Sequence, residues 1–380
     1  MRLNKNICLI ITISLLFFIP GIKLLSQAGG SAVPFLLISP DARGSGMGEV
    51  GTAIADDINA IYWNPAGLGL HTYVPKGGYS DEEKPYGQVA ISFSKWLPQF
   101  NADLYYSYLT VGQYIEGLDG VAAVNFIYMN LGEFTRTHES GKVLGKFISN
   151  EFTIGISYGT VIAPDLCAGF QLRYIQSNLT PTAVGQQDAG TGISGGFDLG
   201  LLWKPSNLKI FDMDLSNRIG LGFNLQNVGP KVTYINESDP LPTQLRLGSA
   251  FTLVQDEYND FKFAIDFAKL LVHRKTILDP NQTEKTISDP LPKSLVTGWS
   301  NAGIELSLGV EYWYSKIIAL RAGYFTEPSS LGNRKFWNFG AGVKYDIFQL
   351  DFSYINTIEE NHPLANTMRF SLIVNWGFIQ

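Results

Sequence analysis

Apolar and polar side chains alternate along most of the chain after residue 87. The clearest run is Met368, Phe370, Leu372, Val374, Trp376 and Phe378, with Arg369, Ser371, Ile373, Asn375 and Gly377 between them. Successive side chains of a strand point to opposite faces, whereas a helix would spread both classes around its axis. Alternation over this length therefore predicts strands.

Fourteen segments follow this pattern, and each is close to the ~10 residues that a tilted strand needs to cross a bilayer. They are 87–95, 102–111, 119–131, 150–161, 165–177, 193–203, 217–227, 243–254, 260–271, 301–314, 317–326, 335–345, 348–356 and 367–377. The sequence therefore predicts an all-β fold, a transmembrane antiparallel β-barrel of about 14 strands over residues 87–380.

The connections between these segments alternate in length. Long gaps at 132–149, 178–192, 228–242 and 272–300 alternate with short gaps at 162–164, 255–259, 315–316 and 346–347, and the gap at 204–216 is the exception. Bacterial outer-membrane barrels have short periplasmic turns and longer outer loops, so this rhythm favours a barrel with its N-terminus in the periplasm. A water-soluble β-sandwich is the alternative, but it explains the alternation without explaining the paired gaps.

The longest gap, 273–300, contains Pro280, Pro290 and Pro292 among polar residues. Proline and polar residues keep such a segment out of the sheet and in water. It is either a solvated crown of the barrel or a binding loop, and the sequence leaves both open.

Residues 1–28 have the layout of a cleaved secretory signal. Arg2 and Lys5 precede an apolar run at 7–19, and Ala28 closes a small-residue site. A transmembrane anchor is the alternative, but the run is shorter than the ~20 residues that a spanning helix needs. We therefore expect an exported chain that becomes integral to the bacterial outer membrane.

Composition agrees with a membrane barrel. Charged residues make up 16% of the chain, below the ~25% usual for soluble domains, while aromatic residues make up 13%. The net charge of -6 argues against a nucleic-acid partner. Cys167 is the one cysteine after the signal, so no internal disulfide is expected. His71, His138, His273 and His362 are scattered, so neither a metal site nor another cofactor is predicted.

A different pattern occupies residues 29–86, ahead of the first strand. The stretch 34–70 is apolar and glycine-rich, yet it carries Asp41, Arg43 and Glu49. These charges would be costly in lipid but are tolerable against a polar lumen. We therefore predict an N-terminal plug that fills or gates the barrel.

Local signals predict the path of this plug. Phe35–Ser39 is expected to be extended, with a turn at Pro40–Asp41. Apolar residues at a loose helical spacing predict a short helix within Gly46–Ile61. A second turn is expected at Asn64–Pro65, because the proline biases Asn64 away from helix and Gly67 can adopt a positive φ. The candidate plug residues, structural or gating, are Pro40, Asp41, Arg43, Gly46, Gly48, Asn64, Pro65 and Gly67.

No catalytic constellation accompanies these residues. The run Gly44–Gly48 lacks the G-x-G-x-x-G spacing, a surrounding βαβ unit and a P-loop lysine. Its glycines are expected to let the backbone turn tightly and pack against a wall. The adjacent carboxylates Asp56 and Asp57 do not point at a common substrate atom as a hydrolase pair must. We therefore expect a protein that is not an enzyme.

The residues VPFLLISPDARGSGMGEVGTA, followed by IYWNPAGL, resemble the PorV/PorQ family of outer-membrane proteins. The runs Ser39–Arg43 and Gly46–Gly48 carry the resemblance, and the match covers about forty residues. The Asn-Pro-Ala element is shared with the long-chain fatty-acid channel family, FadL. The resemblance implies a FadL-like barrel of fourteen strands with an N-terminal plug.

Proteins of this family serve the type IX secretion system. The resemblance implies a non-enzymatic component that receives secreted cargo from the translocon through the cargo's C-terminal signal domain. It then passes the cargo to an attachment complex with a sortase-like peptidase. The expected partners are outer-membrane lipid, cargo, translocon and attachment complex, contacted through external loops. The alternative is a FadL-like channel for long-chain fatty acids or other hydrophobic small molecules. The Asn64–Leu68 element, which is shared with FadL, supports this alternative.

Overall fold

The computed structural model describes most of the chain. The described residues are 30–72, 86–100, 102–138, 140–180, 190–210, 213–234, 237–278, 284–300, 303–329 and 331–376. The predicted signal at 1–28 lies outside them. Among the helices of the described ranges, none combines the length and apolar character that a membrane-spanning helix requires.

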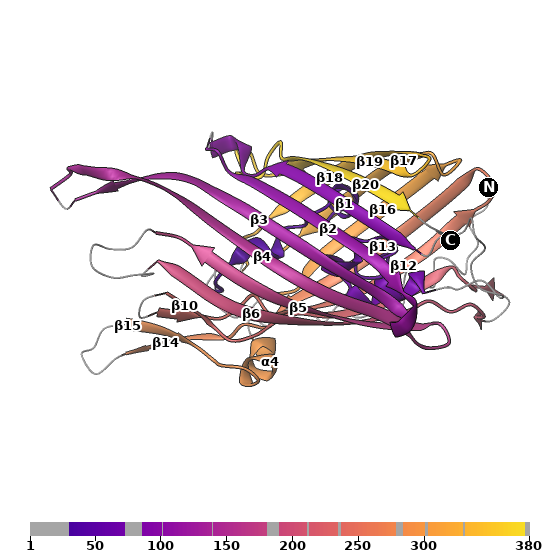
Figure 1. Cartoon of the computed structure of the whole chain (residues 1–380), viewed down its shortest axis with the longest axis horizontal. Helices are drawn as coiled ribbons and strands as arrows, with labels where there is room; N and C mark the ends of the chain where they lie inside the picture. The colour runs from indigo at the N-terminus through magenta and orange to yellow at the C-terminus, as the bar shows by residue number, and fades with distance from the viewer. Residues whose placement is uncertain are drawn as a thin grey trace.

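Fourteen strands form one closed antiparallel barrel (Figure 1). In barrel order they are β1 (Gly87–Lys95), β2 (Tyr105–Ile115), β3 (Gly120–Thr137), β4 (Val143–Ala163), β5 (Leu166–Asn178), β6 (Thr191–Trp203), β9 (Ile219–Val228), β12 (Gln244–Gln255), β13 (Asn259–Leu270), β16 (Glu305–Tyr314), β17 (Ile318–Thr326), β18 (Lys335–Tyr345), β19 (Phe348–Thr357) and β20 (Met368–Trp376). The barrel closes where β1 pairs with β20, from Gly87 opposite Trp376 to Ser94 opposite Arg369. The predicted fold class is therefore confirmed.

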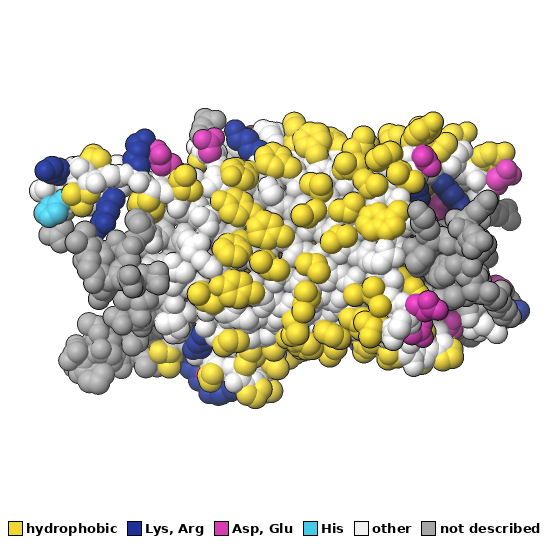
Figure 2. All heavy atoms as spheres, viewed as in Figure 1, with side chains coloured by type: hydrophobic (Ala, Val, Ile, Leu, Met, Phe, Trp, Pro, Cys, Tyr) yellow, Lys and Arg dark blue, Asp and Glu magenta, His cyan; other side chains and the backbone are white. Residues whose placement is uncertain are grey.

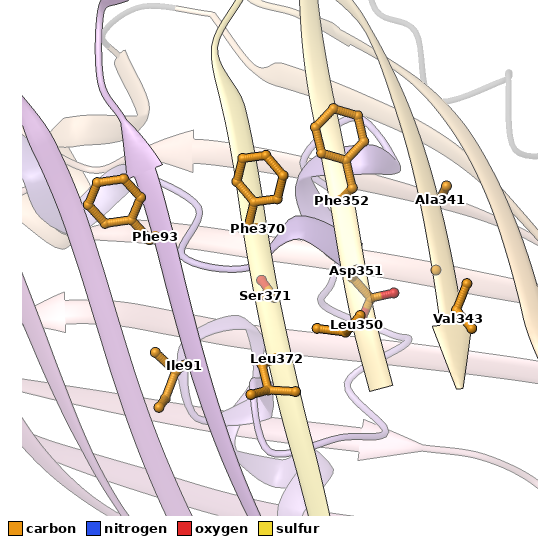
Figure 3. A pocket seen from close by; sticks show the side chains of 11 residues that line it. Ile91, Phe93, Ala341, Val343, Leu350, Asp351, Phe352, Phe370, Ser371 and Leu372 are labelled. Atoms are coloured by element: carbon orange, nitrogen blue, oxygen red, sulfur yellow. The ribbon is translucent and has the colours of Figure 1, made fainter. Parts of the chain in front are cut away.

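Alternation along the strands separates an outer face from an inner face. In β19 and β20, Leu350 and Phe370 are more than half exposed, whereas their neighbours Asp351 and Ser371 are buried. Hydrophobic side chains cover the outer wall of the strands (Figure 2). On this wall Phe93 of β1 lies beside Phe370, next to a shallow groove of about 470 Å³ (Figure 3). This apolar wall is the surface that membrane lipid covers.

A row of aromatic side chains crosses the outer face from β1 to β5. Neighbouring ring centroids are 6.0–6.4 Å apart along Phe93, Tyr105, Tyr128, Phe126, Phe152 and Tyr174. Aromatic side chains form girdles at the membrane interfaces of outer-membrane barrels. The row therefore marks one membrane interface, near the end of the barrel where β1 leads into its loop.

Long connections gather at one end of the barrel, called the loop end, and short connections at the other, called the turn end (Figure 1). The long connections hold η3 (Pro98–Phe100), β10 (Val232–Tyr234), β11 (Glu237–Asp239), β14 (Arg274–Leu278), β15 (Glu284–Ser288), α4 (Lys293–Thr297) and η5 (Gly298–Ser300). The turn end holds η4 (Glu116–Leu118) and a ribbon of β7 (Lys209–Ile210) with β8 (Met213–Asp214). That ribbon explains why the predicted gap at 204–216 is long.

One predicted loop is wrong. Residues 132–149 are not an open connection, because the β3–β4 ladder continues to Thr137 opposite Val143. The ladder passes a bulge between Asn130 and Glu133 and then leaves the barrel. Both faces of this extension meet water, and each mixes apolar with charged or polar residues, so period-two alternation could not reveal it.

Residues 30–72 lie inside the barrel and are called the plug segment (Figure 1). They form η1 (Pro34–Leu37), α2 (Ala42–Gly46), α3 (Ala60–Trp63) and η2 (Pro65–His71). α2 contacts β17–β20, whereas η2 contacts β3–β6.

One local prediction for the plug segment is wrong and another is displaced. Phe35–Ser39 is not extended throughout, because Pro34 fixes the φ of the first position of η1. The plug segment contains short helices, but α2 and α3 lie at the two ends of Gly46–Ile61 instead of within it, because Gly48 and Glu49 have positive φ and end the helical path. The backbone beyond them bonds to side chains of the barrel wall instead of to itself. The apolar spacing therefore reflects burial against several strands, not one helical face.

Candidate functional site

The plug segment folds around the buried Asp41 carboxylate. One Asp41 oxygen accepts a hydrogen bond from the Gly44 amide at 2.7 Å, and the other accepts one from Trp63 Nε1 at 2.6 Å. The Trp63 ring lies so close that a Cβ on Gly44 would come within 2.4 Å of it. Burial raises the pKa of Asp41 above its ordinary value. Asp41 thus joins the start of the plug segment to its centre.

Arg43 fastens the plug segment to β16. Its guanidinium donates two hydrogen bonds to Glu311, each 2.9 Å long, and one to Asp57 at 3.0 Å. It also pairs with Asp56. The two bonds to Glu311 have the fork geometry that makes arginine–carboxylate pairs strong and directional.

Further charges on the wall extend this pairing. Arg321 of β17 donates to Glu311 at 2.7 Å and to Asp351 of β19 at 2.7 Å. The side chains of Glu311, Arg321 and Asp351 are at most 1% exposed. Removing one partner from such a buried network leaves an uncompensated charge, so Arg43 holds the plug segment firmly.

The pKa values of the two plug carboxylates beside Arg43 are shifted in opposite directions. Burial raises the pKa of Asp57 to about 6, against the attraction of Arg43. Burial acts on Asp56 in the same direction, but the charges of Arg43 and Lys262 outweigh it and hold its pKa below the ordinary value. Lys262 Nζ lies 3.7 Å from Asp56. Asp56 therefore stays ionised over the whole range in which Asp57 titrates.

Asp266 of β13 binds the backbone of the plug segment. One of its oxygens accepts hydrogen bonds from the amides of Gly51 and Thr52, at 3.0 and 2.9 Å, and from the Thr52 hydroxyl at 2.6 Å. Arg246 of β12 donates to the same oxygen at 3.2 Å and to the Glu49 carbonyl at 2.9 Å. A wall carboxylate thus replaces the helical hydrogen bonds that this stretch lacks.

β20 supplies another attachment. Ser371 accepts a hydrogen bond from the Ala42 amide at 2.8 Å. Arg369 donates to the Ser45 hydroxyl and approaches Glu49 at 3.4 Å. The start of α2 is therefore held from the side of β20 as well as from β16.

Glycines allow the plug segment to touch the wall backbone. A Cβ on Gly46 would lie 3.0 Å from the Gly340 Cα of β18. Gly48 has φ +75, and its Cβ would lie 2.6 Å from the Leu308 carbonyl. A Cβ on Gly323 of β17 would lie 2.1 Å from the Gly48 nitrogen. Gly46 and Gly48 therefore pack against the wall as the sequence predicts, whereas Gly44 packs against Trp63 of the plug segment.

The Asn64–Gly67 element fits against β4, β5 and β6. Asn64 is extended, as its proline neighbour requires, and its amide donates to the carbonyls of Thr52 and Leu201 at 2.9 and 3.0 Å. A positive φ at Gly67 was the wrong expectation, since Gly67 has no such angle. A Cβ there would lie 1.9 Å from the Ala55 carbonyl, so close packing demands the glycine.

The remaining predicted residues lie in the same place. Pro40 is buried directly before Asp41. Pro65 opens η2, and a Cβ on Gly169 of β5 would lie 2.3 Å from the Pro65 carbonyl. All eight candidate plug residues therefore belong to one buried segment inside the barrel. A gating role for them stays a prediction.

The other side of the plug segment is apolar. Phe35, Leu36, Ile58, Ile61 and Leu68 pack in one cluster with wall residues Tyr106, Tyr108, Ile127, Met129 and Ile175. These wall residues belong to β2, β3 and β5. The plug segment is thus held by charge toward β12–β20 and by apolar packing toward β2–β5.

A charged cavity of about 850 Å³ lies between the plug segment and the turn end. Its ionisable lining residues are Arg43, Asp56, Asp57, His71, Asp165, Lys204, Asp260, Lys262, Lys316 and Lys344. Toward the loop end, Phe325, Phe336, Ile355 and Leu364 form an apolar cluster against Trp96 and Leu97. The turn-end cavity is therefore lined by charges, whereas this loop-end cluster is apolar, with the guanidiniums of Arg334 and Arg369 over its Phe325 and Trp96 rings.

Nothing in the described ranges brings three or more His, Cys, Asp or Glu side chains into a group that could hold a metal ion. The buried acids beside the plug segment are engaged with arginine, lysine or backbone amides. These ion pairs and hydrogen bonds attach the plug segment to the barrel wall.

Comparison with known proteins shows the family of this barrel. No curated protein matches the chain. The family described as "Type IX secretion system protein PorV" matches residues 26–276, well over half of the chain. The chain belongs to the PorV family.

A solved structure shows the same architecture. The toluene transporter TodX from Pseudomonas putida matches with a TM-score of 0.51 and 10% identity, over 94% of this chain and 100% of TodX. A FadL homologue from Pseudomonas aeruginosa matches with a TM-score of 0.47 and 13% identity, over 92% of this chain and 100% of the homologue. At this identity the likeness to TodX concerns the fold alone. The fold confirms an integral outer-membrane barrel for this PorV-family chain.

Sequence analysis missed the wall partners of the plug in this PorV-family chain. Glu311, Asp266 and Arg369 are charged residues at inward positions of strands with apolar outer faces. That position was a usable signal, because a buried charge needs a partner. The pairing itself could not be read from the sequence, since Arg43 and Glu311 are 268 residues apart.

Proposed function

We propose that this protein is a non-enzymatic component of type IX secretion that receives cargo through the cargo's C-terminal signal domain and passes it to the surface attachment complex. The match to the PorV family over residues 26–276 carries the proposal. The translocon, the cargo and a sortase-like attachment complex are its proposed partners, and outer-membrane lipid surrounds its apolar wall.

The geometry of the plug segment supports a role outside the lumen. Opening the lumen would break the Arg43–Glu311 pair. It would also break the hydrogen bonds that the amides of Gly51 and Thr52 donate to Asp266. The turn-end cavity of about 850 Å³ is far smaller than a protein domain, so cargo should be held by the exterior of the loop end.

Deletion of the gene tests this function. Proteins with C-terminal signal domains should disappear from the surface proteome, as measured by mass spectrometry of surface-labelled cells, and a plasmid copy should restore them. Normal surface display in the deletion strain would contradict the proposal.

A channel for hydrophobic small molecules is the second candidate. The fold shared with the toluene transporter TodX favours it. The charged lining of the turn-end cavity opposes it, because an apolar solute would gain little there over water. Purified protein in nanodiscs should show no saturable binding of a long-chain fatty acid. Saturable binding, together with normal cargo display in the deletion strain, would favour the channel.

A further inference from the structure

The outer part of the β3–β4 ladder, residues 133–148, is called the free ribbon because it stands apart from the barrel. The β2–β3 ladder ends at Tyr105 opposite Asn130. The β4–β5 ladder ends at Asn150 opposite Asn178. Beyond these points β3 and β4 pair with each other alone, from Glu133 opposite Ile148 to Thr137 opposite Val143. Both outer backbone edges of the free ribbon therefore lack a neighbouring strand within the described part of the chain.

The free ribbon also exposes large apolar side chains. Phe134, Val143, Leu144 and Ile148 are 47%, 61%, 50% and 63% exposed. Phe134 stacks on Phe147 at a centroid distance of 5.7 Å, on a face with no barrel behind it. The β3–β4 ribbon projects past the ends of the other barrel strands at the loop end (Figure 1). Membrane lipid therefore does not explain the exposure of these side chains.

An isolated two-stranded ribbon is marginally stable in water, and proteins usually protect exposed strand edges. The free ribbon has no proline along its edges. One bulge lies at the base, between Asn130 and Glu133, and redirects the ribbon. A second lies near the tip, where Leu144 is the extra residue of β4, so the edge of β4 is regular from Gly145 to Ile148. A free edge combined with apolar side chains fits a further strand.

The charges of the free ribbon help to identify the kind of molecule that binds its edge. The free ribbon carries Arg136, Lys142 and Lys146 against Glu133 and Glu139. Lys146 pairs with Glu133 at 2.6 Å. With charges this nearly balanced, a polyanion gains little, and backbone hydrogen bonds with apolar contacts should dominate.

We propose that the free ribbon binds an extended strand of a secreted cargo protein, added to the edge of β4. This inference rests on the proposed function and names the surface that carries it. The edge of β4 is favoured because Val143, Leu144 and Ile148 lie on it, whereas the β3 edge carries Phe134 as its large apolar residue. Strand addition supplies main-chain hydrogen bonds, and alternate apolar side chains of the cargo supply specificity.

A pair of matched deletions tests the surface. In the first, residues 134–147 are replaced by Asn-Gly, which joins the opposed residues Glu133 and Ile148. In the control, residues 276–286 of the β14–β15 ribbon are replaced by Asn-Gly, which joins the opposed residues Lys275 and Ile287. Ile148→Lys provides a third variant that keeps the full chain and places a charge on the edge.

The probe is the isolated C-terminal signal domain of a cargo protein from the same organism, and the full-length barrel is held in nanodiscs. The first deletion and Ile148→Lys should each raise Kd at least about tenfold, while the control deletion should change it less than about twofold. Hydrogen exchange should show that binding protects amides within residues 143–148, and affinity should depend weakly on salt.

Each other outcome overturns a defined claim. Equal Kd for both deletions, or binding without amide protection at 143–148, would overturn strand addition while leaving cargo reception intact. No binding of the probe to the wild-type barrel would overturn the proposed function and the surface with it. Protection that grows with protein concentration in the absence of the probe would assign the edge to a second copy of this chain, and so contradict the proposal.

Discussion

Arg43 contacts three carboxylates and reaches Arg321 and Asp351 through one of them, Glu311, and this makes it the residue whose loss should matter most. Arg43→Met removes the charge but keeps an unbranched side chain, leaving Glu311, Asp56 and Asp57 with less compensation. We expect the free energy of unfolding in lipid vesicles, measured by denaturant titration, to fall by about 3–5 kcal/mol. Lys146→Met is the control, because its exposed pair with Glu133 should contribute about 0–1 kcal/mol. Equal losses would show that the buried network does not hold the plug.

Close steric contact at Gly323 of β17 should also affect the stability of the plug segment. In Gly323→Ala the new methyl group would lie 2.1 Å from the Gly48 nitrogen, so the plug segment or β17 must move. Overpacking of this kind costs about 1–3 kcal/mol, measurable by the same titration. Gly117→Ala is the control, since nothing lies within 4 Å of its Cβ. A Gly323→Ala protein as stable as the control would contradict the close contact.

Single residues also show what sequence could and could not provide. Asp41 and Arg43 can be identified because charged residues in an apolar segment require a polar partner or surface. Asn64 can be identified because a following proline favours a turn. Their partners Glu311 and Leu201 could not be assigned, since closure of the barrel decides which strand faces which part of the plug. Gly67 was identified for the wrong reason, because a clash with Ala55 leaves no trace in the sequence.

Among the elements, the stretch between α2 and α3 depends most on the wall. Asp266→Leu removes the acceptor for the amides of Gly51 and Thr52 and leaves these buried donors unpaired. We expect their hydrogen exchange to accelerate at least about tenfold, as local opening becomes easier by roughly 1.4 kcal/mol or more. Asp256→Leu at the exposed β12–β13 turn should leave these amides unchanged. Unchanged exchange in Asp266→Leu would mean that the plug segment orders itself.

Strands that face lipid were predicted well because lipid on one side and a packed lumen on the other impose a period of two. The fourteen strands could therefore be located, with ends that differ by a few residues. The free ribbon and the plug segment obey no such rule. The ribbon has no buried face, and the plug segment is buried on all sides by residues distant in sequence.

At the scale of the whole molecule, we propose that the plug segment closes an otherwise open barrel. Deleting residues 30–72 should convert the protein from a non-conducting barrel into a pore in planar bilayers, because fourteen strands enclose more space than their own side chains fill. Replacing residues 134–147 by Asn-Gly is the control and should stay non-conducting, since that ribbon lies outside the lumen. Conduction by the wild-type protein would contradict closure.

The most direct test asks whether secretion proceeds with the plug segment fixed in place. A Cβ on Gly220 of β9 would lie 4.0 Å from the Ala53 Cβ, and a Cβ on Gly46 would lie 3.5 Å from the Ser353 Cβ of β19. Both distances suit a disulfide, which spans roughly 3.5–4.5 Å between Cβ atoms. The pairs Ala53→Cys with Gly220→Cys and Gly46→Cys with Ser353→Cys, combined with Cys167→Ala, would fasten the plug on two sides.

In cells whose single copy of the gene carries both cross-links, surface proteomics should find proteins with C-terminal signal domains at wild-type amounts. The same proteins should be missing when the gene is deleted. Display that is lost in the cross-linked cells and returns on reduction would contradict a surface role with a closed lumen, and display that persists after deletion would contradict a role in secretion.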